Sequence, residues 1–514
     1  MRMTFFFCLL LMLTGCEPRL DENTMPGRHQ IVRLSDSEIK GLDPQKISDL
    51  SSLRIAADQF EGLTRLNARG EAEPGLAEQW MVSDDGRVWT FILRKNLRFS
   101  DGASFDATIF PQILKRLRDP GNAAPAKSLF DNISGVRATG ENGVQIILAA
   151  PAPSLPIVLA HPAMAAIPLH RIGAVGDKWT SDRPLVTSGP YQMTSWRLND
   201  HARLDRNANW HDERKIVETI IWKPMDDGLS AMRLFLAGGA DIAADYPASR
   251  HRWLQEEHPG LAHSVPYLGS YYYAFNTRRP PFDDRRVRMA LSLAVERQWI
   301  VDEVIGIGNI PAWGLLPPGL AGQENFKPEW ADQPREERLS KARKLLADAG
   351  YNVDNPLEFE IRFNSSTEHR RVSVALAAMW KPLSVNASLF NSEAALHFAA
   401  LRQHDFALAR SGWIADIPTA DNFLMVHQSA NGSGNYSGYN NPDYDGLITK
   451  ALETPDPDQR DALMRQADEI LSADTPVLPL YFYVTRSLVS ERISGWEDNI
   501  SNVHPSRTLR IRAK

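Results

Sequence analysis

The sequence predicts an α/β protein made of several compact units, and three observations support this prediction. Segments with the apolar–polar alternation of strands are interspersed with segments of helical periodicity, without internal repeats or low-complexity tracts, which excludes solenoids. Hydrophobic residues make up 43% of the chain and aromatic residues 9%, which is enough apolar surface for real cores. A length of 514 residues corresponds to about three units of roughly 150 residues each.

The first 16 residues have the features of an export signal. A positive charge at Arg2 precedes an apolar run from Phe5 to Leu13, which small residues and Cys16 follow. The run is much shorter than the ~20 residues that a membrane-spanning helix needs. Leu13-Thr14-Gly15-Cys16 resembles the bacterial lipobox, so we expect residues 1–15 to be removed and Cys16 to carry a lipid. The alternative is an ordinary secretory signal with a coincidental cysteine.

Strand patterns dominate the part of the chain that follows. The alternating segment Trp89–Arg94 lies between two turn sequences, Asp84-Asp85-Gly86 and Ser100-Asp101-Gly102, and predicts a hairpin-rich element. Val144–Leu148 reads as another strand, and the prolines that follow mark a boundary. Further strands are expected within residues 188–203 and 216–222.

Helices and strands then alternate. Residues 271–276 predict a strand, and Asp283-Asp284 a helix start, with apolar residues at helical spacing from Val287 onward. On that helix we expect the arginines at 285, 286 and 288 to form a solvated face. A second helix is expected over about residues 340–349, ending at Gly350. Residues 477–483 predict a buried strand. The last thirty residues have a β-rich pattern, and we expect them to return to the first lobe.

Charge and cysteine content exclude several classes of protein. The chain has 57 Lys and Arg against 63 Asp and Glu, a formal net charge of −6, so no overall field attracts it to nucleic acid. A mean hydropathy of −0.32 excludes a polytopic membrane protein. The only cysteines are Cys8 and Cys16, so disulfides, cysteine nucleophiles and cysteine-ligated zinc are excluded from the rest of the chain.

Motifs of enzyme chemistry are missing. Gly306-Ile307-Gly308 begins like a dinucleotide loop, but Pro311 stands where the third glycine belongs. Ser37 and Lys40 have the spacing of a penicillin-binding serine, but no Lys-Thr-Gly triplet follows. The 13 histidines do not cluster at metal-ligand spacing, whereas the scattered acidic residues leave a glycosidase pair open. We therefore predict no catalytic residue, metal site or cofactor.

Nine segments in colinear order carry a specific resemblance that spans almost the entire mature chain. They are Leu42-Asp43-Pro44, Phe60–Leu63, Ala77–Ala107, Ser188–Tyr191, Tyr271–Leu291, Gly308–Ala312, Ala342–Tyr351, Gly412–Asp416 and Pro476–Val484. Together they resemble family 5 of the bacterial extracellular solute-binding proteins, the peptide/nickel class of ABC importers. The greatest similarity is to the oligopeptide-binding proteins.

The resemblance implies a two-lobed periplasmic-binding-protein-like fold of class II type, in which a ligand is enclosed by hinge motion. The two chain crossings of the hinge are expected near residues 267–270 and 484–487. The expected parts are a signal peptide (1–15), lobe I (16–50, 168–270 and 485–514), an extra α/β subdomain on lobe I (51–167) and lobe II (271–484).

The same resemblance implies the residues that bind a peptide. The aspartate of the segment Gly412-Trp413-Ile414-Ala415-Asp416 pairs with the ligand's ammonium in the family, and the flanking backbone adds a β-like ladder. This assigns Asp416 as the amine anchor, with Gly412 and Ile414 as backbone partners. Four more assignments follow. Trp413 is a pocket wall, Arg410 matches an arginine close to the ligand, and Arg402 and His369 resemble residues that meet the carboxylates of peptides of different lengths. Tyr272 is a further candidate for the cleft.

Four of these residues also have a simpler interpretation. Asp416 fits a solvated loop, and His369 fits a charged exposed turn. Trp413 and Tyr272 fit a core equally well.

Two departures from the family pattern stand out. Several members carry a disulfide between the strand before the tyrosines and the Gly-Trp-x-Ala-Asp segment, where this chain has Gly269 and Ile414. Ile307 lies in a region where some members have a lysine that serves longer ligands, so the preferred ligand length stays open.

The function expected from the resemblance is that of a lipid-anchored receptor of the periplasm or cell envelope. It captures oligopeptides between its lobes as a monomer and delivers them to the permease of an ABC transporter, without chemistry, cofactor or nucleic acid. One alternative is another solute: a dipeptide, a murein peptide, glutathione or a metal chelate. The other alternative, from a different class, is an exported hydrolase.

Overall fold

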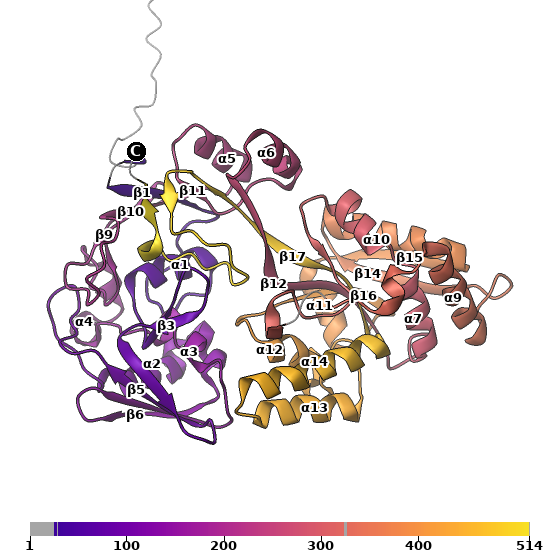
Figure 1. Ribbon diagram of the computed structural model, residues 1–514, viewed down its shortest axis with the longest axis horizontal. Helices are drawn as coiled ribbons and strands as arrows, with labels where there is room; N and C mark the ends of the chain where they lie inside the picture. The colour runs from indigo at the N-terminus through magenta and orange to yellow at the C-terminus, as the bar shows by residue number, and fades with distance from the viewer. Residues whose placement is uncertain (1–24, 28, 323–325, 513–514) are drawn as a thin grey trace, which may run out of the picture.

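The computed structural model describes residues 25–27, 29–322 and 326–512, so the signal segment and Cys16 lie outside it. Two lobes lie side by side and are joined by two long strands, β12 (Ala262–Phe275) and β17 (Val477–Val489) (Figure 1). One mixed sheet passes through both lobes in the order β15-β14-β16-β12-β17-β11-β1-β10-β9-β8, with β13 also paired to β17. The fold is thus the two-lobed α/β arrangement predicted.

The strands of this sheet fall on either side of the crossing pair. On the lobe I side they are β1 (Gln30–Ser35), β8 (Tyr191–Arg197), β9 (His201–Arg206), β10 (Thr219–Pro224) and β11 (Ile242–Ala243). On the lobe II side they are β13 (Ile310–Pro311), β14 (Leu357–Asn364), β15 (Val385–Ser392) and β16 (Leu408–Ile414). The ladder between β12 and β17 is interrupted between Pro266 and Ser270, which is where the chain passes from one lobe to the other.

Lobe I carries further, smaller sheets. A four-stranded sheet has the order β4 (Ala77–Val82), β5 (Val88–Leu93), β7 (Gly143–Leu148) and β6 (Ile133–Thr139). Two pairs of short strands are β2 (Thr64–Leu66) with β3 (Ala72–Pro74) and β18 (Ile493–Ser494) with β19 (Arg510–Ile511). The predicted hairpin is confirmed: β4 pairs with β5, and Gly86 in their turn has a φ of +68° that favours glycine.

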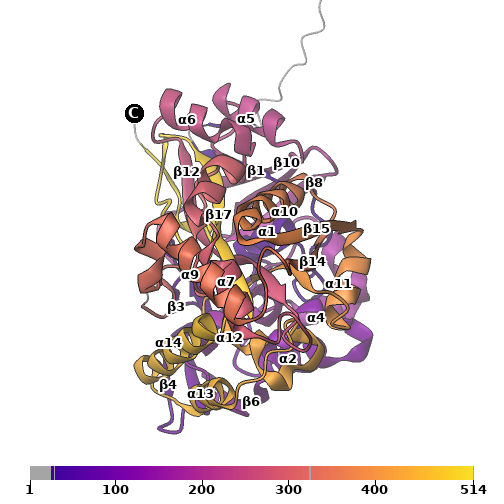
Figure 2. The ribbon, with the colours of Figure 1, turned by 90° about the vertical axis from the view of Figure 1, so that its right-hand side faces the viewer.

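Helices cover the sheets of both lobes (Figures 1 and 2). Those of lobe I are α1 (Leu50–Gln59), α2 (Ile109–Arg118), α3 (Leu155–Val158), α4 (Leu169–Val175), α5 (Gly228–Leu236) and α6 (His251–Glu257). Those of lobe II are α7 (Arg285–Leu293), α8 (Arg297–Trp299), α9 (Arg335–Asp348), α10 (Thr367–Trp380), α11 (Ala394–Arg402), α12 (Ala420–Leu424), α13 (Pro442–Glu453) and α14 (Pro457–Asp474). Within the described ranges, none of them has the length and apolar character to cross a membrane.

The hydrophobic cores divide along the same line as the lobes. One large core joins the four-stranded sheet to the main sheet of lobe I, because Phe91 and Val144 belong to the same cluster as Ile31 and Ile220. Lobe II has two cores, one on each face of β12: Tyr271 and Tyr273 enter one of them and Tyr272 the other. Alternation along the strand causes this division, since neighbouring side chains point to opposite faces.

The prediction for helix α7 is right in its start and in the exposure of Arg285 and Arg286, and wrong for Arg288. The carboxylate of Asp284 caps the helix by accepting from the backbone N–H of Arg286. Arg288, predicted to be solvated, is only 5% exposed and donates hydrogen bonds to the carbonyl oxygens of Phe282 and Thr475. Backbone carbonyls replace its lost water, so a cation is tolerated there.

The end of the chain also differs from the prediction in part. It does return to lobe I, where Arg33 donates to the carbonyl oxygen of His504 and to the hydroxyl of Ser506. It is not β-rich, because after β17 only the two-residue strands β18 and β19 pair. This segment is therefore held by hydrogen bonds from side chains to its irregular backbone, and not by the hydrogen-bond ladder of a β-sheet.

The lobes meet at a second place besides the crossing strands. Arg460 at the start of α14 donates to the carbonyl oxygen of Pro151 in lobe I, with N···O 3.3 Å, and pairs with Asp421. Pro455, in the turn before α14, lies against Gly86 of the β4–β5 turn. The contact lies at the far end of the molecule from the α5–α6 pair (Figure 1), so it limits how the lobes can move relative to one another.

Candidate ligand-binding site between the lobes

A cavity of about 560 Å³ lies between the two lobes. Its lobe I wall includes one face of α1 and the segment Ser501–Arg507. Tyr267 and Leu268 of the crossing strand and Ile414–Pro418, which follow β16, complete it. Residues from the beginning, middle and end of the chain therefore meet here.

Asp416 lies in this cavity with no counter-ion. Its side chain is exposed and forms no hydrogen bond or ion pair with any described residue. The segment that carries it is fixed, because the backbone N–H of Ala415 donates to the carbonyl oxygen of Leu268 at 2.9 Å. Burial raises the pKa of the nearby Tyr267 hydroxyl, and the charges of Arg54 and Asp416 act on it in opposite directions. Tyr267 therefore lies within electrostatic reach of both groups.

The strand that leads to Asp416 has an unpaired edge. Within the described chain, β14 pairs with β16 only at Leu408 and Ala409, whereas β12 pairs with β16 along its whole length. On the open side, Nε2 of His397 donates to the carbonyl oxygen of Arg410 at 2.8 Å. Beyond that point, the backbone of Gly412–Ile414 is free to pair with an added extended chain.

Arg410 lies beside this edge, and no carboxylate of a described residue pairs with it. One guanidinium nitrogen donates to the Tyr483 hydroxyl at 2.9 Å, and the guanidinium carbon lies 4.8 Å from the centre of the Tyr271 ring. A Cβ at position 412 would come within 3.1 Å of the Tyr483 hydroxyl, so the glycine leaves room for this arrangement. Arg410 has no ion pair with a described carboxylate, so it is suited to an anion supplied by a ligand.

His369 completes the group. It lies in the first turn of α10, partly buried, with Nδ1 3.1 Å from the Tyr271 hydroxyl. Burial, followed by the positive charges of Arg410 and His397, lowers its pKa to about 3. The imidazole is therefore neutral near pH 7 and acts by hydrogen bonding.

Other residues assigned from the sequence lie elsewhere. Trp413 points to the opposite face of β16, where it packs against the core that contains Tyr272 and donates to Asn422 at 3.2 Å. Tyr272 is 3% exposed, and its ring meets His427 edge-on at 5.7 Å. Arg402 is exposed in the last turn of α11. Of the eight residues assigned from the sequence, only Ile414 and Asp416 line the cavity between the lobes. The packing of Trp413 and Tyr272 in a core agrees with the simpler interpretation of both.

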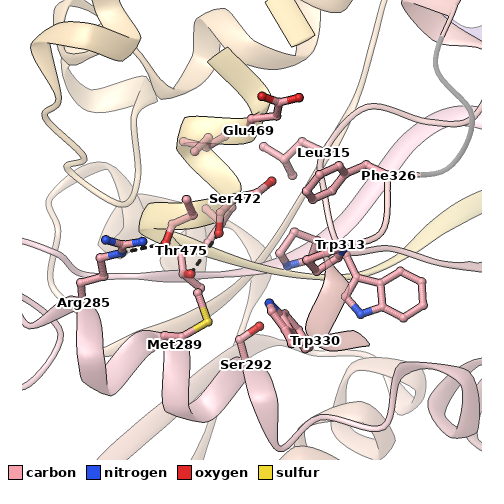
Figure 3. Close-up of a pocket in the computed structure, with 15 residues that line it drawn as sticks. Arg285, Met289, Ser292, Trp313, Leu315, Phe326, Trp330, Glu469, Ser472 and Thr475 are labelled. Carbon is pink, nitrogen blue, oxygen red and sulfur yellow. Dashed lines mark hydrogen bonds between the residues drawn. The ribbon is translucent and has the colours of Figure 1, made fainter. Parts of the chain in front are cut away.

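A second, smaller cavity of about 260 Å³ lies within lobe II (Figure 3). Trp313, Phe326 and Trp330 line it together with Arg285 and Met289 of α7. None of the residues assigned from the sequence is among them. The described residues hold no group of histidine, aspartate and glutamate side chains that could bind a metal ion.

Sequence reasoning missed the lobe I wall of the larger cavity. Four side chains of α1 face it at helical spacing: Leu50, Leu53, Arg54 and Ala57. The opposite face of the helix, with Ile55 and Ala56, is buried. The spacing was visible in the sequence, but which face meets a cavity depends on the packing of the helix.

Comparisons with known proteins agree with one another. The family model for bacterial extracellular solute-binding proteins, family 5 Middle, matches residues 71–435. The periplasmic oligopeptide-binding protein OppA of Salmonella typhimurium is 33% identical over 499 residues, which cover 93% of this chain and 92% of that protein. The solved structure of the periplasmic murein tripeptide-binding protein MppA, in its unliganded open form, gives a TM-score of 0.87 at 30% identity, covering 95% of this chain and 98% of that one.

A liganded structure is less similar. Haemophilus influenzae OppA in complex with the peptide RPPGFSPFR gives a TM-score of 0.72 at 27% identity, covering 95% of this chain and 99% of that one. The two solved structures are related to this chain at nearly the same identity, but the unliganded open form superposes better. The relative position of the lobes here is therefore closer to that of an open form.

Proposed function

Because the chain belongs to family 5 of the bacterial extracellular solute-binding proteins, we propose that it captures oligopeptides between its lobes for an ABC transporter. The single observation that carries the proposal is the unpaired carboxylate of Asp416, which lies in the interlobe cavity at the end of a strand with a free edge. A carboxylate beside unpaired strand backbone suits an extended chain that begins with an ammonium group.

The mechanism follows from the groups at the site. The ligand ammonium pairs with Asp416, and the ligand backbone extends the sheet along Gly412–Ile414. A ligand carboxylate then meets Arg410, with His369 as a neutral hydrogen-bond partner. Arg402 remains a candidate partner of a ligand carboxylate, while Trp413 and Tyr272 pack in the core on the other face of the sheet. When the lobes close, water leaves the cleft and each of these interactions strengthens.

The setting of this activity is also part of the proposal. Relatives such as OppA of Salmonella typhimurium are periplasmic, and we place this chain in the periplasm or cell envelope as a monomer. It binds and releases its ligand unchanged, needs no cofactor and passes the ligand to the permease subunits. ATP hydrolysis belongs to other subunits.

Asp416 provides the decisive test. Removing one partner of a desolvated charge pair costs about 2–5 kcal/mol, which is roughly 30-fold to several thousand-fold in affinity. Calorimetry of the Asp416→Ala protein with a free-amine peptide should show this loss, and N-acetylation of the peptide should weaken binding to the parent protein. Asp354 is an exposed aspartate of lobe II, and Asp354→Ala serves as the matched control that should bind like the parent. Binding of the Asp416 variant within threefold of the parent, or harmless acetylation, would overturn the amine assignment.

A second candidate is a murein peptide receptor, because the unliganded structure that superposes well is that of a murein tripeptide-binding protein. Native mass spectrometry of protein purified without refolding separates the two. A ladder of co-purified peptide masses supports the oligopeptide receptor, whereas a single murein peptide mass supports the alternative.

Lipid attachment at Cys16, outside the described residues, is a further part of the proposal. It rests on the lipobox-like sequence Leu13-Thr14-Gly15-Cys16. Cys16→Ser should move the protein from the membrane fraction to the soluble fraction. A variant that stays membrane-bound would refute the anchor, and Cys8→Ser is the control that should not alter fractionation.

A further inference from the structure

Four arginines line the cavity between the lobes: Arg33, Arg54, Arg65 and Arg507. Only two carboxylates among the described residues line it, Glu61 and Asp416. The wall is therefore cationic unless its arginines are neutralised elsewhere.

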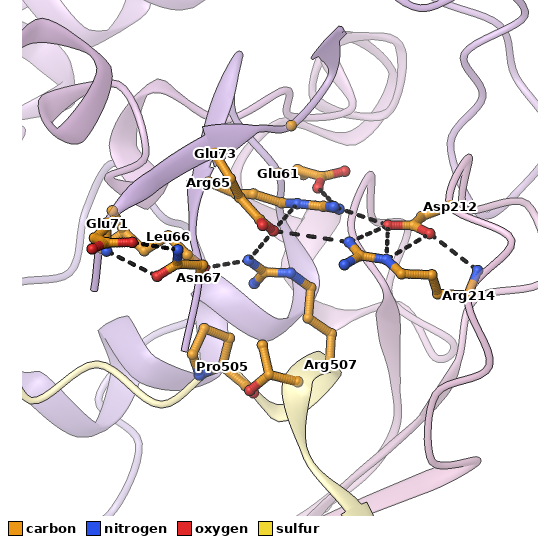
Figure 4. A network of polar contacts seen from close by, with 12 residues as sticks. Glu61, Arg65, Leu66, Asn67, Glu71, Glu73, Asp212, Arg214, Pro505 and Arg507 are labelled. Carbon is orange, nitrogen blue, oxygen red and sulfur yellow. Dashed lines mark hydrogen bonds and ion pairs between the residues drawn. The ribbon is translucent and has the colours of Figure 1, made fainter. Parts of the chain in front are cut away.

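Arg65 and Arg507 belong to a closed network (Figure 4). Arg65 forms ion pairs with Glu61, Glu73 and Asp212 at 2.8–2.9 Å, and Arg507 pairs with Glu73 at 3.2 Å. Their partner Glu61 is also saturated, since Nε2 of His211 and Nε1 of Trp210 contact it at 2.6 and 2.9 Å. The guanidinium groups of Arg65 and Arg507 are therefore paired within the protein and are not free to bind a ligand carboxylate.

Arg33 is largely satisfied as well. It is 5% exposed, donates to His504 and Ser506 at 2.8 and 2.7 Å, and lies 4.3 Å from the centre of the Trp222 ring. Its guanidinium is therefore part of the packing of the chain's end.

Arg54 is the exception. It is only partly exposed, lines the cavity, and forms no hydrogen bond or ion pair with any described residue. Burial lowers the pKa of its guanidinium, an effect that Asp36 and Tyr267 oppose. A cation that loses water without gaining a partner destabilises the protein, unless a partner arrives with the ligand.

From this cavity and its one unpartnered guanidinium, we infer that the ligand carries a carboxylate side chain close to its amino end, which Arg54 binds. The inference rests on the proposed peptide-binding function. Two arguments place the acidic residue near the amino end. Arg54 and Asp416 line the same cavity as Tyr267, and the charges of both act on its hydroxyl. In the proposed mechanism, the C-terminal carboxylate is bound by Arg410.

The surface around Arg54 suits an acidic side chain with an aliphatic stem. Leu50, Leu53 and Ala57 share the cavity face of α1 with Arg54, so the methylenes of a glutamate can pack on apolar surface while its carboxylate reaches the guanidinium. The preferred ligands are therefore acidic peptides.

Calorimetry with short alanine-based peptides tests the inference. One glutamate is placed at each position in turn, and each peptide is matched by a glutamine twin, in which glutamine replaces that glutamate. Every peptide is made in two forms, one with a free C-terminal carboxylate and one with a C-terminal amide. At one position near the amino end the parent should prefer glutamate by about tenfold. Arg54→Gln should reduce that preference to less than about twofold and leave the affinity for the glutamine twin within about twofold of the parent. Arg252→Gln, at an exposed arginine of α6, is the control that should keep the preference.

The other outcomes each decide the question. No glutamate preference in the parent, or one that survives in Arg54→Gln, overturns the inference while peptide binding stands. If the parent prefers peptides with a C-terminal carboxylate over the amides and Arg54→Gln loses this preference, Arg54 binds the terminal carboxylate and the inference is overturned. Tighter binding of the neutral peptides by Arg54→Gln would show that Arg54 pairs with Asp416 on closure. If the parent binds none of the peptides, the proposed function fails and the inference with it.

Discussion

At the scale of single residues, several buried histidines make the folded protein sensitive to acid. Burial lowers the pKa of His161, His397 and His427 to about 4 and, together with nearby cations, that of His504 to about 3. Between pH 6.5 and about 4 the unfolded chain binds protons at these residues and the folded chain does not. Stability therefore falls as the pH drops through this window and is fully regained above pH 6.5.

His427 is the clearest case, because neither of its ring nitrogens has a hydrogen-bond partner and it packs against Tyr272. We expect His427→Leu to be at least as stable as the parent at pH 7.5. Between pH 6.5 and 5 the parent should lose roughly 2 kcal/mol more of its free energy of unfolding than the variant. Urea denaturation over this pH range measures the difference, and His29→Gln, at an exposed histidine, should keep the slope of the parent. Equal slopes in the parent and His427→Leu would contradict a neutral buried imidazole.

The residues of the candidate site differ in how well their place in the site could be predicted from the sequence. Asp416, Gly412 and Arg410 lie in or near a short motif, and of the three only Asp416 lines the interlobe cavity. Arg54 lies outside every motif, and its place on the cavity wall depends on how α1 packs within lobe I. Trp413 is part of the motif, but strand alternation turns it away from the cavity.

At the scale of elements, the strand pair β12–β16 offers a place to add the disulfide that the sequence lacks. Gly269 lies directly opposite Ile414 in the ladder, the two positions at which several family members are bridged. Gly269→Cys with Ile414→Cys should close a long loop and, once oxidised, gain about 2–4 kcal/mol in the free energy of unfolding. A Cβ at position 269 comes within 2.6 Å of the Tyr483 ring, so Gly269→Cys alone should lose about 1–3 kcal/mol.

Denaturant titration with and without reductant measures both effects, and thiol titration reports whether the bond forms. The chain has no cysteine after Cys16, so the background is clean. Free thiols in the oxidised double variant would contradict the register of these strands. A bond that forms without added stability would contradict the predicted stabilisation.

Helices and strands were predicted well where local patterns decide them, as for β5 and the start of α7. The prediction was wrong for Arg288, because some of the carbonyl oxygens that accept its hydrogen bonds belong to Asp474 and Thr475 at the end of α14, nearly two hundred residues later in the chain. It was also wrong for the β-rich character of the last thirty residues, which are held by side chains of distant segments such as Arg33. Contacts between distant parts of the chain leave no local pattern.

At the scale of the whole molecule, the colinear order of motifs predicts the two-lobed architecture but not the position of the lobes. That position depends on the relative free energies of open and closed forms, which a ligand shifts. Here the lobes resemble an unliganded open form more than a peptide complex. The connections between them are few: the crossing strands with their interrupted ladder, the segments that line the cavity, and the contact of Arg460 with Pro151.

We therefore expect peptide binding to close the lobes about the crossing strands. Only a closed cleft can take a whole peptide out of water while leaving its release reversible. Small-angle X-ray scattering should show a smaller radius of gyration for the parent at saturating peptide. The Asp416→Ala protein, measured at a peptide concentration that saturates the parent but lies below the weakened Kd of the variant, should keep the radius of the unliganded form. An unchanged radius in the saturated parent would mean that ligand binds without hinge closure, and the interlobe cavity would then have to act as a rigid open site.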